Sequence, residues 1–271
     1  MELDYYLRDL STEDWTRFNV MDKLIFPDEP LRKSSFNSGL AGLKTLSVVA
    51  VDKEDKDFLG YYKIGVYGNE GHVQRVGVHP EHQRKGIGST LLKRSMHHLK
   101  SAGCKEYFLY VKEDNEAAIN LYKKFGFEIE EKSWQFIVPF EKMVDKPKGK
   151  CRHVDWGEIQ IISLRFRLNP HRIQQYFGRE NQHVLVYEHM CQQLGFCRFS
   201  PDYPGGMPFV LKDASLALDF ISILKSYITD KAFKNLKVTF DNQELLVAFL
   251  KKEGILVNYE LLKMRKDVEM G

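Results

Sequence analysis

The residues best suited to chemistry lie in a short basic run with two glycines, QRKGIGST, from Gln83 to Thr90. The run follows a β-rich segment that ends at Val78 and precedes an amphipathic segment typical of a helix. Glycine lets backbone N–H groups approach an anion, and a helix start directs its positive dipole end to the same place. Arg84 and Lys85 add positive charge at the rim. The run therefore predicts a site for a pyrophosphate.

Two other phosphate-binding motifs fit this run less well. A Walker loop needs a lysine before its Ser or Thr, whereas Gly88 is followed directly by Ser89. A Rossmann fingerprint needs a third glycine where Leu91 stands, and no acidic ribose partner follows in a parallel strand. The remaining alternative is a simple strand-to-helix turn with a basic rim.

Two motifs together resemble the GNAT N-acetyltransferase superfamily. The first, V-x-P-x-x-Q-R-x-G-x-G, runs from Val78 to Gly88. The second, N-x-x-A-x-x-L-Y followed by F-G-F, runs from Asn115 to Phe127. The resemblance is strongest over residues 72–127. It implies acetyl-coenzyme A as the co-substrate and a primary amine of a small molecule or a peptide as the acceptor.

The resemblance also implies which residues bind the coenzyme. Backbone amides of residues 83–89 would hold the pyrophosphate, and main-chain groups at a splayed strand end would pair with the pantetheine arm. The coenzyme-binding residues that it implies are Val76, Val78, Gln83, Arg84, Lys85, Gly86, Ile87, Gly88, Ser89 and Asn115. Variable elements would form the walls of the acceptor site, here residues 27–44, residues 134–140 and parts of the second half.

Tyr122 is the general acid that the resemblance implies, protonating the thiolate as it leaves. A phenol suits this role because it stays protonated at neutral pH and can donate a proton when the thiolate forms. The alternative is a core aromatic residue, since Tyr122 lies on the same helical stripe as Ala118 and Phe125.

The general base is less sharply indicated. An amine arrives as an ammonium ion and must lose a proton before it attacks the thioester. His72 opens the strand that leads to the pyrophosphate turn, and an imidazole with an ordinary pKa of about 6.5 could accept that proton. Three alternatives stay open: His72 is only a surface histidine beside a turn, Glu70 is the base, or a chain of water molecules does the work.

A metal ion is not expected. His79 and His82 lie three residues apart in the turn, but the sequence offers no third ligand nearby and the turn has another role. His97 and His98 are neighbours on a predicted helix and therefore point in different directions.

A scaffold that could position these residues is visible in the hydrophobic pattern. The strands expected in the first half are residues 3–7, 46–51, 58–67, 72–78 and 107–111, with further β segments at 127–129 and 134–140. The expected helices are one that starts at residues 11–14 and continues through residue 21, and those at residues 88–102 and 115–125. Residues 31–44 are expected to form a surface loop. The order predicts the α/β fold class, with a mixed sheet flanked by helices, as in the GNAT fold.

The second half repeats part of this order. A strand, an Asp-Asn pair and a helix ending at glycine occupy residues 107–126 and recur at residues 236–254 with one extra residue. This echo favours a tandem duplication. A β-rich segment is expected at residues 158–166, and a basic linker at residues 146–150.

The second half lacks the chemistry of the first. Residues 209–218, where the repeat should carry its pyrophosphate turn, contain no glycine, and Leu250 stands at the position of Tyr122. We therefore predict a catalytic domain over residues 1–145 and a degenerate GNAT-like domain over residues 146–271. The second domain either helps to shape the acceptor cleft or only buries surface.

The composition fits a globular protein of 271 residues, with 43% hydrophobic and 28% charged residues. A net charge of +3 gives no support to a nucleic-acid binder. No signal peptide and no run of about 20 apolar residues is evident. Four cysteines without a C-x-x-C pair favour reduced thiols. These features predict a cytoplasmic protein, a monomer or homodimer, without a membrane partner.

Two functions from other classes remain open at this level. One is a non-catalytic sensor that binds acyl-coenzyme A and regulates through its two halves. The other is a protein-interaction scaffold whose motif is idle. Calorimetry with coenzyme A separates the scaffold from the other two, and acetyl transfer to an amine separates the enzyme from the sensor.

Overall fold

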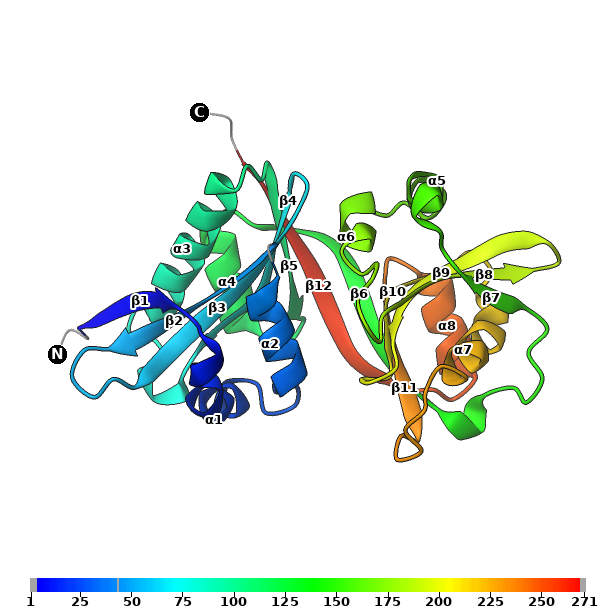
Figure 1. Cartoon of the computed structure of the whole chain (residues 1–271), viewed down its shortest axis with the longest axis horizontal. Coiled ribbons are helices and arrows are strands. Elements are labelled where there is room, and N and C mark those ends of the chain that lie inside the picture. The colour runs from blue at the N-terminus through cyan, green and yellow to red at the C-terminus, as the bar shows by residue number, and fades with distance from the viewer. Residues whose placement is uncertain (1–3, 43, 269–271) are drawn as a thin grey trace. The chain divides into compact units, whose positions relative to one another are not determined.

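The computed structural model describes residues 4–42 and 44–268. Predictions for residues 1–3, 43 and 269–271 therefore lie outside the described residues. The chain forms two compact units (Figure 1). The first comprises residues 1–110, 115–129 and 264–271, and the second comprises residues 111–114 and 130–263. The predicted functional division at residues 145 and 146 remains a prediction.

The first unit is a sheet with helices on both faces (Figure 1). Its strands, in hydrogen-bonded order, are β1 (Tyr5–Asp9), β2 (Thr45–Asp52), β3 (Phe58–Tyr67), β4 (Glu70–Val78) and β5 (Glu106–Lys112). Its helices are α1 (Trp15–Ile25), α2 (Lys33–Ala41), α3 (Ile87–Ser101) and α4 (Glu116–Lys124). Strands β5, β6 (Glu128–Pro139) and β12 (Val257–Asp267) each have residues in both units.

The close approaches around β4 show which helix covers which face. A side chain at Gly71 would meet Leu99 of α3, and one at Gly77 would meet Ile25 of α1. Strands β1 to β4 are antiparallel neighbours, whereas β4 and β5 run parallel. The α/β fold class with a mixed sheet is therefore confirmed.

Two expectations for the first half are wrong. Residues 31–44 were expected to be a loop, but Lys33–Ala41 is helix α2, which buries Phe36 against Phe18 and Trp15. Most residues of α2 are polar, and Phe36 is its main buried side chain. The sequence therefore shows only a weak helical spacing of apolar residues. The two β segments expected at 127–129 and 134–140 are one continuous strand, β6.

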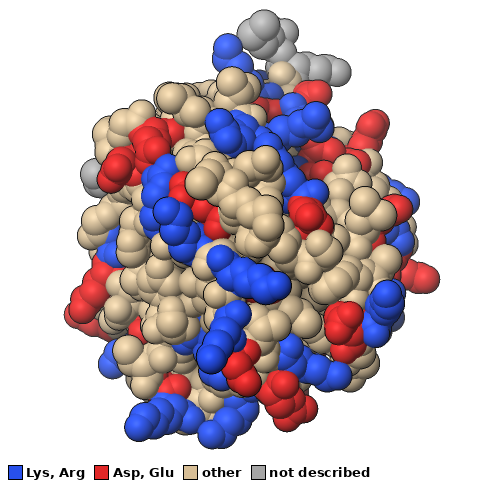
Figure 2. All heavy atoms as spheres, turned by 90° about the vertical axis from the view of Figure 1, so that its right-hand side faces the viewer, with Lys and Arg blue, Asp and Glu red and all other residues tan. Residues whose placement is uncertain are grey.

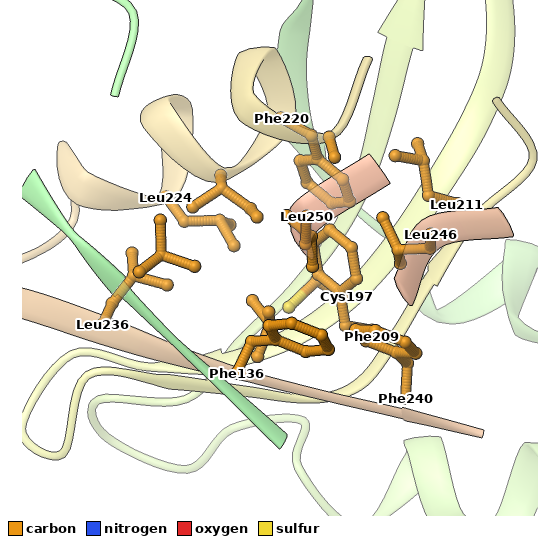
Figure 3. Packing of buried hydrophobic residues seen from close by; sticks show 14 of the residues in the cluster. Phe136, Cys197, Phe209, Leu211, Phe220, Leu224, Leu236, Phe240, Leu246 and Leu250 are labelled. Atoms are coloured by element: carbon orange, nitrogen blue, oxygen red, sulfur yellow. The ribbon is translucent and has the colours of Figure 1, made fainter. Parts of the chain in front are cut away.

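The second unit is also built of hydrogen-bonded strands and helices. Its hydrogen-bonded order is β6, β11 (Asn235–Asp241), β10 (Gly205–Leu211), β9 (Gln192–Ser200), β8 (His183–His189) and β7 (Lys150–His153). Its helices are α5 (Ile159–Phe166), α6 (Pro170–Gln174), α7 (Ala217–Lys225) and α8 (Glu244–Lys252). Figure 3 shows the core between this sheet and α7 and α8, where Leu250 packs among aromatic and aliphatic side chains.

The segment at residues 158–166 is a helix and not a strand. Ile159, Ile162 and Phe166 are buried at helical spacing, whereas Ile161 and Leu164 are exposed. The run of β-branched residues favours a strand by propensity, but burial on one helical face decides the outcome. The predicted linker also differs, because its last residue begins strand β7 and Asp219 accepts hydrogen bonds from two of its backbone amides.

Candidate active site

The turn after β4 has the geometry of an anion site. A short 3₁₀ turn, Pro80–His82, follows the strand, and Gly86 at φ +84° is the N-cap of α3. Thr90 is the first residue of α3 whose N–H donates back, to the carbonyl of Gly86 at 3.1 Å. The N–H groups of residues 87–89 have no partner within the helix, as in the first turn of any helix. They can therefore bind a phosphate oxygen.

The side chains around this turn add charge and hold its shape. Arg84 also has a positive φ, +58°, so it and Gly86 make the turn curl tightly. The Gln83 side-chain amide donates to the carbonyl of Val78 at 3.2 Å and closes the base of the turn. Arg84 and Lys85 are exposed at its rim. The structure thus brings the predicted turn residues 83–89 together in one tight turn before α3.

The two glycines of the turn have different reasons to be glycine. Gly86 adopts a left-handed conformation that other residues reach only with strain, and a Cβ atom there would meet no neighbouring atom. Gly88 has an ordinary helical conformation, and a Cβ atom would lie 3.6 Å from Val78 and 3.7 Å from Leu121. The fold requires glycine at Gly86 for its backbone, but it does not require glycine at Gly88.

Backbone groups near the end of β4 point toward the side of β5. In an antiparallel pair, residues that exchange backbone hydrogen bonds alternate with residues that do not. His79 donates to the carbonyl of Leu59 at 2.8 Å, and the register from Gly60–Val78 to Tyr62–Val76 is regular. Val76 and Val78 therefore fall between the bonded pairs. Their N–H and C=O groups point away from β3, and of these four groups the carbonyl of Val78 accepts from the Gln83 side chain.

Strands β4 and β5 pair only where the two strands begin. The parallel pairs are Glu70–Glu106, Gly71–Tyr107 and His72–Phe108. Within the described residues this pairing goes no further than His72, so the later part of β4 has an open edge. An extended amide-bearing ligand could add to that edge as a strand does.

Tyr122 is a buried residue of α4. It is 8% exposed, and its ring meets Phe127 edge-on with centroids 6.0 Å apart. Burial raises the pKa of its phenol to about 12. Leu121, its neighbour, is the α4 residue that approaches Gly88, so α4 packs on the first turn of α3. A phenol that keeps its proton thus lies on the helix beside the turn.

Asn115 and His72 lie where the sequence predicted, with contacts that limit their roles. Asn115 is the N-cap of α4, and its side-chain oxygen accepts from the N–H of Ala118 at 3.1 Å. Only its NH₂ group is left for a ligand. His72 is half-buried at the last pair of β4 and β5, and its ring stacks on Phe108 with centroids 4.2 Å apart.

The turn also brings together three groups of the kind that bind metal ions. Nitrogen and oxygen atoms of His79, Glu81 and His82 lie within 4.8 Å of one another. Glu81 supplies the third group that sequence reasoning did not consider, and it is exposed. His79 accepts from the N–H of Glu81 at 3.4 Å. The expectation that the protein uses no metal stays a prediction.

The second unit has an equivalent strand edge that is already filled. Lys212 donates to the carbonyl of Leu194 at 2.8 Å, as His79 does to Leu59, so Phe209 and Leu211 correspond to Val76 and Val78.

One side chain occupies this edge. The Gln243 amide donates to the carbonyl of Phe209 at 3.0 Å and accepts from the N–H of Leu211 at 2.9 Å. Sequence reasoning missed Gln243, because a glutamine before a helix gives no distinctive signal.

Comparison with known proteins agrees with this geometry. The sequence model of the acetyltransferase (GNAT) family matches residues 6–127. The first half of the chain is a GNAT acetyltransferase domain. The mycothiol acetyltransferase of Thermobifida fusca is 36% identical over 107 residues, which are 36% of this chain and 32% of that protein. The chain therefore covers about a third of the length of this relative.

Solved structures extend the likeness in fold to the whole chain. A GCN5-related N-acetyltransferase from Sphaerobacter thermophilus has a TM-score of 0.72 at 13% identity, covering 98% of this chain and 96% of that one. A tandem GNAT protein from the clavulanic acid biosynthesis pathway has a TM-score of 0.65 at 11% identity, covering 99% and 100%. The chain therefore has the tandem GNAT fold, and only its first half matches the family in sequence.

Proposed function

We propose that the chain is an N-acetyltransferase that moves an acetyl group from acetyl-coenzyme A to a primary amine of a small molecule or peptide. One observation carries the proposal. The N–H and C=O groups of Val76 and the N–H of Val78, which point away from β3, lead directly into a turn that offers the amides of residues 87–89, and Tyr122 lies on the adjacent helix. A pantetheine arm and its pyrophosphate need these groups in this order.

The reaction follows from the chemistry of these groups. The amine gives a proton to His72 or to water, and its nitrogen then attacks the thioester carbonyl carbon. As the tetrahedral adduct collapses, the carbon–sulfur bond breaks, the nitrogen gives its second proton to water, and the departing thiolate takes the phenolic proton of Tyr122. Water returns a proton to the tyrosine. Because burial raises the pKa of Tyr122, this proton is present throughout the neutral range.

The second unit serves, in this proposal, as a domain without coenzyme. Gln243 occupies the backbone groups that a second pantetheine arm would need. Leu250, fully buried in the core of Figure 3, stands where the first unit has a phenol. Residues 209–218 contain no glycine to open a turn. We therefore propose one coenzyme per chain.

The surface features favour a small-molecule or peptide acceptor. Figure 2 shows one face on which acidic side chains lie between the basic ones, unlike the continuous basic surface of a nucleic-acid binder. None of the described helices is both long and apolar enough to cross a bilayer. The four cysteines, all among the described residues, form no disulfide.

Incubation with acetyl-coenzyme A and a panel of amines tests the proposal through the release of free thiol. We expect release with at least one amine, and a mass increase of one acetyl group on that amine. Tight coenzyme binding without release to any amine would favour the non-catalytic sensor. Absence of coenzyme binding would favour the scaffold.

A further inference from the structure

A buried ion pair joins α1 to β4 in the first unit. Asp22 is fully buried, and its Oδ1 atom lies 3.0 Å from Nη1 of Arg75. The Tyr61 hydroxyl donates to the same oxygen, and burial raises the pKa of this phenol, so it keeps its proton. A buried carboxylate needs such partners because desolvation makes an unpaired charge costly.

The side chain of Arg75 reaches α1 because β4 contains a β-bulge. Lys63 pairs with Arg75, but the next residue of β3, Ile64, pairs with Val73, so Gln74 is an extra residue. Gly71 faces α3, and simple alternation from there would place Arg75 on the α3 face as well. The bulge turns it to the α1 face instead.

The same ion pair holds the segment between α1 and α2. Arg75 donates through Nη2 to the carbonyl of Glu29, and Asp22 accepts from the N–H of Leu31 through Oδ2. The Arg75 guanidinium also lies 4.5 Å from the centroid of the Phe26 ring. Residues 26–31 are therefore fixed to β4 through one arginine.

The ion pair of Asp22 and Arg75 contacts a segment that is expected to line the acceptor site. Residues 27–44 are among those expected to form the acceptor wall, and His72, the expected base, alternates with Gly71 and so faces away from α3. Arg75 directly precedes Val76 on the strand.

We propose that Arg75, held by Asp22, is a positioning residue that fixes residues 26–31 beside the reacting amine and so sets the affinity for the acceptor. This rests on the proposed acetyltransferase function. The pyrophosphate turn leads into α3, which covers the sheet face opposite to the one that Arg75 occupies, so we expect coenzyme affinity not to depend on the pair.

The test uses Arg75→Lys in the full chain. Lysine keeps the charge beside Asp22, but it cannot also reach the carbonyl of Glu29 in the fork geometry of arginine. With the amine that shows turnover, we expect KM for the amine to rise roughly 10-fold while kcat stays within about 3-fold. The Kd for coenzyme A should stay within about 2-fold, and amide exchange in residues 26–32 should become faster.

Arg8→Lys is the matched control. The Arg8 guanidinium donates to both carboxylate oxygens of Asp14 at 2.7 Å. This ion pair lies in the same unit, and neither residue belongs to β4 or to residues 26–31. Arg8→Lys should leave KM and the exchange of residues 26–32 unchanged. If Arg75→Lys folds poorly, the double variant Asp22→Asn with Arg75→Met removes both charges and should show the same KM rise.

The outcomes separate the two claims. Faster exchange together with a raised KM supports the positioning role. An unchanged KM in Arg75→Lys overturns it, whether or not exchange becomes faster. If no amine shows turnover, the proposed function fails, and the positioning role fails with it. Unchanged exchange of residues 26–32 overturns the structural claim alone.

Discussion

Asn115 and Gln243 stand immediately before corresponding helices, α4 and α8, yet their side-chain amides bind different partners. Asn115 caps its own helix through Ala118. Gln243 reaches across to β10 and bonds both Phe209 and Leu211. Among the described residues, no side chain bonds the C=O of Val76 and the N–H of Val78 in this way, although Gln83 bonds the carbonyl of Val78. Gln243 therefore fills, in the second unit, the backbone groups that correspond to the C=O of Val76 and the N–H of Val78.

Gln243→Met tests the two hydrogen bonds that this side chain makes to β10. The change keeps the volume but removes both hydrogen bonds and leaves two backbone groups of β10 unpaired, at a cost of about 1–3 kcal/mol in the free energy of unfolding. Urea denaturation should show this loss, and Gln192→Met, at an exposed position in β9, should not. Calorimetry should give one coenzyme per chain for wild type and variant. Two equivalents in the wild type would contradict the account.

The sequence predicted the strands and helices around the motif well, and physical reasons explain where it did less well. The turn at Gly86 is readable because two glycines and a helix start occur together. The bulge at Gln74 has no sequence signature, so the pairing of Arg75 with Asp22 could not be foreseen. In α5, the β-branched residues favoured a strand, while tertiary burial of Ile162 favoured a helix.

Tyr122→Phe should lower kcat by roughly 100-fold, because the thiolate then leaves without a positioned acid. The coenzyme Kd should stay within about 2-fold. Since burial raises the phenol pKa to about 12, the acid form of Tyr122 persists as pH rises, and it should cause no loss of rate below about pH 10.

Tyr107→Phe is the control for this change, since burial also raises the pKa of that phenol to about 12 and its hydroxyl donates to the carbonyl of Met96. It should leave kcat within about 2-fold. Turnover by Tyr122→Phe at the wild-type rate would exclude the acid role.

His72→Phe should separate the two bases considered for the amine. Phenylalanine can keep the stacking on Phe108 but has no nitrogen to accept a proton. If His72 is the base, kcat/KM at neutral pH should fall by about 100-fold and Glu70→Gln should change little. A rate that is unaffected by His72→Phe would leave Glu70 or water as the acceptor of the proton.

Because of the ion pair of Arg8 and Asp14, the free energy of unfolding should fall at acid pH. The hydrogen bonds from Arg8 lower the pKa of Asp14 to about 2. The stabilisation of the fold by this ion pair is therefore complete above about pH 4 and is lost as the pH falls through 2. Urea denaturation between pH 5 and 2 should show a loss of roughly 2 kcal/mol that is missing in Asp14→Asn. An equal loss of stability at low pH in the wild type and in Asp14→Asn would contradict this prediction.

The pyrophosphate turn is the central claim, and calorimetry of coenzyme A binding to Gly86→Ala tests it most directly. Gly103 is the matched control, because it follows the other end of α3 at φ +82° and a Cβ atom there would also meet no neighbour. Both alanine variants carry a backbone strain of about 1 kcal/mol. We predict at least a roughly 10-fold loss of affinity for Gly86→Ala and none for Gly103→Ala. Equal, wild-type affinity in both would contradict the account.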